Sequence, residues 1–220
     1  QGSTFVDTMH WQPETPSQLL VFDREDFSLV KTVEIPPTFV FHFGNAWENG
    51  TAIEFTASAY PDTQFVKSGM RRLAQQLPGP YHDDPRLVRY SLDVKAGKAI
   101  VTELETAMEF PVFDSAQPFA AQRLYGVDSG KGTVSGLPSS IVSVDPRSGS
   151  RTHYDYGPDT VVEEPQYLAA GYLVHSFLDF SAKRTGVAIL RNDALADGPV
   201  AVMDMERVLP LGFHGCFLPA

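Results

Sequence analysis

The strongest restriction on the fold is a repeated unit in which two short β-strands are joined by a turn that begins with aspartate. Aspartate favours such turns because its carboxylate accepts hydrogen bonds from the backbone of the residues that follow it. The turns begin at Asp23, Asp93, Asp145 and Asp193 of the 220 residues. The strands expected around them are residues 17–22 with 29–35, 87–92 with 98–104, 140–144 with 150–154, and 187–190 with 200–205. These units run through the whole chain, which is therefore predicted to be all-β.

The spacing of the units indicates the architecture. The last two intervals between aspartate turns are about fifty residues long, which is the size of one blade of a β-propeller. A chain of this length holds about four blades at roughly 40 to 50 residues each. The first interval is longer because it includes another hairpin and a short helical insertion, expected over Thr63–Leu77 and ended by Pro78. No linker divides the chain, so we expect one domain over residues 1–220.

Composition excludes several classes of protein. The formal net charge is −10, from 17 basic and 27 acidic residues, and this disfavours a nucleic-acid partner, whose binding needs a basic face. No run of about eighteen apolar residues is present, so no membrane-spanning helix is predicted. The first residues lack the features of a signal peptide, and the absence of an initial Met favours a fragment or a processed chain. The one cysteine, Cys216, is interpreted as a small core residue rather than a metal ligand or nucleophile.

Two histidines lie in apolar surroundings. His42 is embedded in an aromatic run that turns at Asn49–Gly50 and returns as a second strand, which is a strong hairpin signal. His214 lies near the C-terminus between Gly212 and Gly215, whose small size lets the backbone approach a neighbour closely. Taken alone, either histidine is more often a core residue than a ligand. The histidines His153 and His175 match no ligand motif.

Read together, four segments resemble the carotenoid cleavage oxygenase family, which includes apocarotenoid and lignostilbene-type dioxygenases. They are Phe-His-x-x-Asn-Ala-Trp-Glu at residues 41–48, Met-Glu-Phe-Pro at 108–111, Glu-Pro at 164–165 and Gly-Phe-His-Gly at 212–215, in that order. The resemblance implies part of a seven-bladed β-propeller, of which this chain matches the C-terminal half. We therefore expect the partner of the open blades to be a missing N-terminal segment of the same protein.

The resemblance also implies a non-haem Fe(2+) centre held by four histidines on the propeller axis. His42 and His214 would be two of these ligands, and the other two would come from the N-terminal half. Neutral imidazole nitrogen suits ferrous iron. Glu109 and Glu164 would bond the outer N–H groups of these ligands, and Glu164 fits this role better than Glu163 because Pro165 follows it. Glu48 could share this role, but we favour capping of the adjacent turn.

The implied reaction is cleavage by O2 of a carbon–carbon double bond in a carotenoid, apocarotenoid or stilbene-like substrate, with activity only when the N-terminal half is present. No catalytic residue is expected beyond the metal centre, because the cofactor carries the chemistry. Phe41, Phe43, Trp47 and Phe217 would line a substrate tunnel, or they would simply fill core. The alternatives are a non-catalytic propeller remnant that binds an apolar ligand or a partner protein, and a generic propeller with coincidental motifs.

The expected location follows from the cysteine content and the substrate class. A single cysteine is compatible with a reducing compartment, so we expect the cytoplasm or a plastid-like compartment. Polyene substrates partition into lipid, which leaves peripheral membrane contact open, although the sequence shows no strong amphipathic helix.

Overall fold

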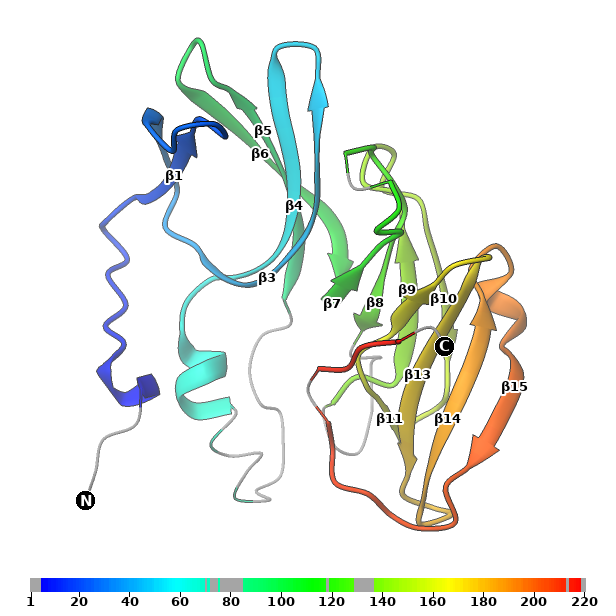
Figure 1. The fold of residues 1–220 in the computed structure, drawn as a ribbon. Helices are drawn as coiled ribbons and strands as arrows, with labels where there is room; N and C mark the ends of the chain where they lie inside the picture. The colour runs from blue at the N-terminus through cyan, green and yellow to red at the C-terminus, as the bar shows by residue number, and fades with distance from the viewer. Residues whose placement is uncertain are drawn as a thin grey trace.

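The computed structural model describes residues 5–69, 71, 75, 85–117, 119–128, 137–212 and 214–218. Within these ranges fifteen β-strands form four antiparallel sheets, which confirms the predicted all-β class. Figure 1 shows the sheets following one another in chain order, from the blue N-terminal pair to the orange C-terminal sheet. Among the described residues no helix is long and apolar enough to cross a membrane.

The four sheets differ in size, and each is built from consecutive parts of the chain. The first pairs β1 (Ser17–Phe22) with β2 (Leu29–Ile35). The second has the order β3 (Phe39–Asn49), β4 (Ala52–Tyr60), β5 (Arg86–Asp93), β6 (Lys98–Ala107). The third has the order β10 (Arg151–Asp155), β9 (Ser140–Val144), β8 (Leu124–Asp128), β7 (Glu109–Val112). The fourth has the order β11 (Thr160–Val162), β13 (Tyr172–Asp179), β14 (Arg184–Arg191), β15 (Pro199–Asp204), and β12 (Gln166–Leu168) also pairs with β13.

The aspartate turns that the sequence predicted form in the expected way at three of the four positions. The carboxylate accepts a backbone N–H two or three residues later, at 2.7 Å for Asp23 and 2.8 Å for Asp93 and Asp145. Asp193 instead forms an ion pair with Arg191 at 2.7 Å. A fourth turn of the predicted kind joins β13 to β14, where the carboxylate of Asp179 accepts a backbone N–H at 2.9 Å. This last turn was not among the predicted ones.

The alternation of Met108, Phe110 and Val112 indicates the buried strand β7, whereas β8, β11, β12 and β13 were not predicted from the sequence. In β8 and β11 nearly every residue is buried, so the alternation of apolar and polar residues that marks a half-buried strand is absent. The predicted helix over Thr63–Leu77 begins with a π-helical turn at Phe65–Gly69 (η2). Most of the rest of that prediction lies outside the described residues.

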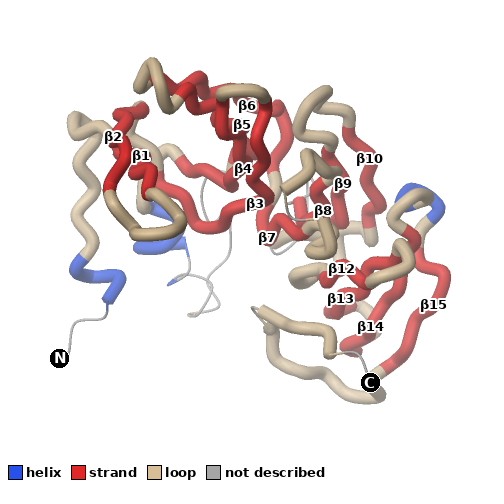
Figure 2. Tube along the Cα trace, turned by 45° about the horizontal axis from the view of Figure 1, so that its top comes forward, coloured by secondary structure: helices blue, strands red, loops and turns tan. Residues whose placement is uncertain are grey.

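Apolar side chains hold consecutive sheets face to face. Ile35 of the first sheet packs with Ala57 and Val88 of the second. Between the second and third sheets, Leu87 packs with Met108, Leu124 and their neighbours. A larger cluster joins the third and fourth sheets and contains Tyr125, Val127, Ile141, Val162, Leu173, Phe177, Ala188, Leu190 and Leu195. Burial of these faces is the main favourable term in folding, and it arranges the sheets along an arc (Figure 2).

Both ends of this arc keep large apolar side chains exposed. On the first sheet Leu20, Phe22 and Val30 are 52%, 47% and 53% exposed. On β15 at the other end, Val200 and Met203 are 55% and 58% exposed. The sheets at the two ends of the arc therefore present apolar side chains to solvent.

A buried histidine in β13 belongs to the core rather than to the metal motifs. His175 is 3% exposed, and its Nδ1–H donates to the carbonyl oxygen of Ser176 at 2.9 Å. Its Nε2 accepts a hydrogen bond from the hydroxyl of Tyr156 at 2.8 Å. Burial disfavours the charged imidazolium, which lowers the pKa of His175 to about 4. His175 is therefore a neutral hydrogen-bonding member of the core.

We predict that His175 makes the fold acid-sensitive. Its pKa is about 4 in the folded chain and 6.5 by default, so between these values the unfolded state binds one more proton. The stability due to neutral His175 is complete above pH 6.5 and declines as the pH falls through this window, by about 1.4 kcal/mol per pH unit at most. His175→Gln should flatten the dependence of the unfolding free energy on pH in urea titrations. The exposed-site control His153→Gln should keep the wild-type slope, and equal slopes in all three proteins would contradict the prediction.

Candidate functional site

The two histidines singled out in the sequence lie against each other. His42 is on β3 and His214 is on the segment that follows β15, yet their ring centroids are 5.2 Å apart with the planes at 74°. Figure 1 shows how this happens, since the red C-terminal segment runs back alongside the fourth sheet. The structure therefore brings together two imidazoles from opposite ends of the chain.

The His42 side of the site is built on strand pairing. The β3–β4 ladder carries irregularities between Val40 and His42 and between Phe43 and Ala46, and bulges of this kind redirect side chains. The His42 ring meets Phe41 edge-on at 4.9 Å and Phe110 at 4.8 Å. Its side chain is only 20% exposed. The strand and its aromatic neighbours thus hold this imidazole in a largely dry position.

Glu109, the first residue of β7, orients His42. Its Oε2 lies 2.5 Å from Nδ1 of His42, and since a carboxylate can only accept, Nδ1 carries the proton. The hydroxyl of Tyr60 donates to Oε1 at 2.8 Å, and the backbone N–H of Phe110 donates to Oε2 at 2.9 Å. Three donors satisfy a carboxylate that is only 8% exposed, which a buried charge requires.

The backbone around Glu109 is shaped for this contact. Phe110 has a left-handed conformation with φ of 50°, which is uncommon for an aromatic residue. On the adjacent strand β8, a Cβ at Gly126 would lie 2.5 Å from the carbonyl oxygen of Glu109. Glycine at this position therefore allows β7 and β8 to approach closely.

Glu164 has the corresponding role for His214. Its Oε1 lies 3.3 Å from Nδ1 of His214, and its Oε2 accepts the backbone N–H of Gly215 at 2.9 Å. The His214 side chain is 58% exposed, whereas that of Glu164 is 15% exposed. Phe110 also contacts the His214 ring, at 5.5 Å and 77°. A single aromatic side chain thus touches both imidazoles.

These contacts fit the ligand chemistry of a divalent transition metal. When Nδ1–H donates to a carboxylate, Nε2 keeps its lone pair and is the nitrogen free to bind a metal. Both histidines have this arrangement. Among the described residues no group of three or more His, Cys, Asp or Glu side chains could hold a metal ion. The described part of the chain therefore offers two imidazoles and not a complete ligand set.

The residues expected to line a tunnel are placed differently from one another. Phe41 contacts His42, whereas Phe43 is 62% exposed and has a ring contact with Phe55 at 6.3 Å. Trp47 is 2% exposed and Phe217 is 55% exposed. Of the four, Phe41 is the one whose ring contacts a site histidine, namely His42.

Two further sequence interpretations concern polar residues near the motifs. Glu48 is exposed at the end of β3, beside the Asn49–Gly50 turn where we expected a capping role. The interpretation of Cys216 as a core residue is wrong, because the structure exposes this thiol. The segment that carries it lies over a sheet rather than inside one, so its local apolar sequence was a poor guide to burial.

Two residues near His42, Tyr60 and Phe110, were not predicted from the sequence to belong to the site. Phe110 follows Glu109 in a motif that was recognised for its carboxylate alone. Tyr60 pairs with Phe39 across the hairpin and stacks on Phe65 at 4.9 Å. The sequence signal that could have identified Tyr60 is its position at the end of a buried strand, since a buried tyrosine hydroxyl usually has a hydrogen-bond partner.

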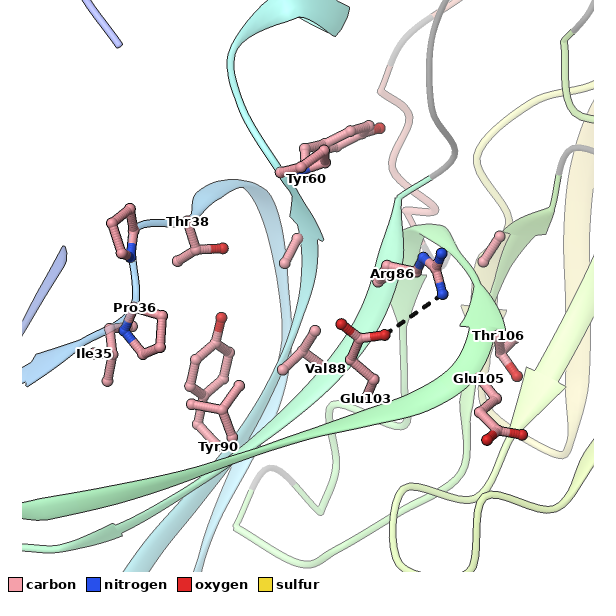
Figure 3. A pocket seen from close by; sticks show the side chains of 15 residues that line it. Ile35, Pro36, Thr38, Tyr60, Arg86, Val88, Tyr90, Glu103, Glu105 and Thr106 are labelled. Atoms are coloured by element: carbon pink, nitrogen blue, oxygen red, sulfur yellow. Dashed lines mark hydrogen bonds and ion pairs between the residues drawn. The ribbon is translucent and has the colours of Figure 1, made fainter. Parts of the chain in front are cut away.

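A cavity of about 760 Å³ adjoins this network through Tyr60, which lines the cavity (Figure 3). The Tyr60 hydroxyl also donates to Glu109. Tyr90 and Pro36 contribute apolar surface to the walls, and Arg86 and Glu103 form an ion pair at 3.5 Å. The cavity is therefore mixed in character, with apolar rings on one side and charges on another.

Comparison with known proteins places these features in context. A family model described as RPE65, retinal pigment epithelial membrane protein, matches residues 1–219. The chain is 23% identical over 218 residues to a carotenoid 9,10(9′,10′)-cleavage dioxygenase of Crocus sativus, covering 88% of this chain and 39% of the relative. It is 25% identical over 237 residues to an isoeugenol monooxygenase of Pseudomonas nitroreducens, covering 95% of this chain and 48% of the relative.

The structural likeness concerns the fold. The chain matches the crystal structure of cobalt-substituted Synechocystis ACO with a TM-score of 0.79 at 20% identity, covering 95% of this chain and 45% of the other. An apocarotenoid-15,15′-oxygenase of Synechocystis is 22% identical over 227 residues. The chain spans 39% to 48% of the length of these three curated relatives.

We predict that Tyr60→Phe lowers the free energy of unfolding, because it removes the hydrogen bond from the Tyr60 hydroxyl to Glu109. The change removes one of three donors to a buried carboxylate, and a lost hydrogen bond to a charged group costs about 1.5 to 3 kcal/mol of unfolding free energy. Urea denaturation of the variant and of the exposed control Tyr172→Phe should show this loss for Tyr60 alone. An unchanged midpoint in Tyr60→Phe would show that the bond contributes nothing.

Proposed function

Because the chain belongs to the RPE65 family, which includes carotenoid cleavage dioxygenases, we propose that it is part of an iron-dependent oxygenase. The reaction is oxidative cleavage of a carbon–carbon double bond in a carotenoid, apocarotenoid or stilbene-like substrate. One observation carries this proposal, namely the contact between His42 and His214 with a carboxylate on Nδ1 of each ring.

The proposed architecture is four blades of a seven-bladed β-propeller over residues 1–220. Face-to-face packing of consecutive sheets supports it, as does the fold likeness with a TM-score of 0.79. The exposed apolar ends of the arc would then meet further blades. The relatives are more than twice as long as the aligned part of this chain, so these blades are assigned to the remainder of a longer protein.

In this proposal His42 and His214 hold ferrous iron through Nε2, and further ligands come from outside the chain. The iron supplies the dioxygen chemistry that protein side chains lack. Glu109 and Glu164 keep Nδ1 protonated and the rings oriented, which raises the basicity of the ligating nitrogen. Neither carboxylate acts as a general acid or base here, because each is already occupied by donors.

The aromatic side chains give the site its preference for apolar substrates. Phe41 and Phe110 contact the His42 ring, and Phe110 also contacts the His214 ring. Flat apolar rings pack well against a conjugated chain or an aromatic ring. This agrees with a substrate class that spans carotenoids and compounds such as isoeugenol, the substrates named for the relatives.

Loss of either histidine should remove the metal. In the full-length protein we expect His42→Ala and His214→Ala each to lower bound iron by about tenfold or more, as loss of even a supporting residue typically does. Elemental analysis of purified protein measures this, and chromatography of the carbonyl products measures cleavage. His153→Ala, an exposed histidine on β10, is the matched control. Wild-type iron content in either ligand variant would refute the proposal.

The chain alone should be nearly inactive. With two of the proposed ligands and part of the substrate wall, residues 1–220 by themselves should retain little iron and cleave little polyene. The comparison is with the full-length protein under the same conditions. Full activity from this segment alone would show that two histidines suffice and that the proposed ligand set is wrong.

A further inference from the structure

His214 lies on a segment that follows the last strand, and from Leu209 onward the segment is attached by hydrogen bonds to side chains. After β15, the backbone N–H of Met205 donates to the carbonyl oxygen of Thr185 at 3.0 Å, and that of Leu209 donates to the Thr185 hydroxyl at 2.8 Å. Beyond this point the described residues 211, 212 and 214–218 belong to no helix or strand and are exposed. The position of His214 therefore depends on a few polar anchors.

Two adjacent glutamates supply the anchors nearest to His214. Glu164 binds Gly215 on one side of the histidine, as described above. On the other side, the backbone N–H of Gly212 donates to Oε1 of Glu163 at 2.5 Å. The backbone is thus held on both sides of the imidazole, and Glu163 holds the side that Glu164 does not reach.

Glu163 is itself fixed to the fourth sheet. Its backbone N–H donates to the carbonyl oxygen of Ser176 on β13 at 3.1 Å, and the Ser176 hydroxyl donates to its Oε2. One carboxylate oxygen thus binds the sheet and the other binds the C-terminal segment. Hydrogen bonds to an ionised carboxylate are roughly twice as strong as those between neutral groups, so Glu163 forms a strong link between the sheet and the segment.

Apart from the ring contacts of His214 with His42 and Phe110, the segment is separated from the fourth sheet by a gap. A cavity of about 310 Å³ lies between the segment and the sheet, lined in part by Glu163, Glu164, Ser176, His214 and Cys216. Where such a gap separates two surfaces, few van der Waals contacts hold them together. The polar bridge through Glu163 therefore carries much of the attachment.

We propose that Glu163 is a positioning residue for His214. By holding Gly212 it sets the direction from which the chain enters the histidine, and so the orientation of the ring toward a metal. The inference rests on the proposed function, because positioning matters only if His214 is a ligand. Both oxygens of Glu163 are engaged, so we assign it positioning and not ligation.

Cobalt(II) titration of the iron-free full-length protein tests this role, with the visible absorption of the bound ion as the readout. Glu163→Ala should weaken cobalt(II) binding by about tenfold and change the absorption spectrum. Glu163→Gln keeps a carbonyl oxygen that can accept the Gly212 N–H, and it should recover most of the affinity. Glu34→Ala, the same change at an exposed site on β2, should leave affinity and spectrum unchanged.

Two further measurements separate positioning from a general loss of folding. Ser176→Ala keeps Glu163 but removes the hydroxyl that orients it, and it should weaken binding in the same direction by a smaller factor. Hydrogen exchange of the metal-free protein should become faster in the peptide containing Gly212 in Glu163→Ala, while the strands of the fourth sheet stay protected.

The outcomes distinguish this inference from the proposal it rests on. Wild-type cobalt(II) affinity and spectrum in Glu163→Ala would overturn the positioning role and leave the proposed function standing. An equal loss of affinity in Glu34→Ala would also overturn it, because the effect would not depend on the bridge. If the wild-type full-length protein binds no cobalt(II) at all, the proposed function itself fails, and the positioning role fails with it.

Discussion

Two carboxylates that accept hydrogen bonds from two imidazoles define the site in this structure. Glu109 is nearly buried and would be costly as an unpaired charge. The hydrogen bonds from His42, Tyr60 and the Phe110 backbone therefore stabilise the carboxylate, and the carboxylate in turn orients His42. Each bond fixes one ring nitrogen as a donor and leaves the other as a ligand. In the proposed metal centre, these hydrogen bonds within the chain would orient both imidazoles.

The two halves of the site are supported in different ways. His42 lies on a strand paired along most of its length and is packed between aromatic rings. His214 lies on an exposed segment that Thr185, Glu163 and Glu164 attach to the fourth sheet. Segments with few buried contacts open at lower free-energy cost than core strands. The segment that carries His214 can therefore change position more easily than the strand that carries His42.

The arc of sheets explains why such distant residues meet. Each sheet packs its apolar face on the next, so strands at corresponding positions of successive sheets come to lie along the inner side of the arc. β3 and β7 supply His42 and Glu109 from neighbouring sheets, and the segment after β15 returns to them. Membership of the RPE65 family agrees with this arrangement, since the same fold at 20% identity is found in ACO.

The sequence by itself determined the features that depend on local signals. Alternating apolar residues and aspartate turns located most hairpins, as at Asp23, Asp93 and Asp145, because a turn requires only neighbouring residues. The four ordered motifs likewise identified the family. The tertiary structure alone decided the register of His42, which an unbroken hairpin would place opposite Ala59 and the irregularity between Phe43 and Ala46 places opposite Ser58. It also decided that Tyr60 and Glu163 form hydrogen bonds in the site and that Cys216 is exposed. These features depend on contacts between segments that are far apart in the sequence, and the local pattern of neither segment indicates such contacts.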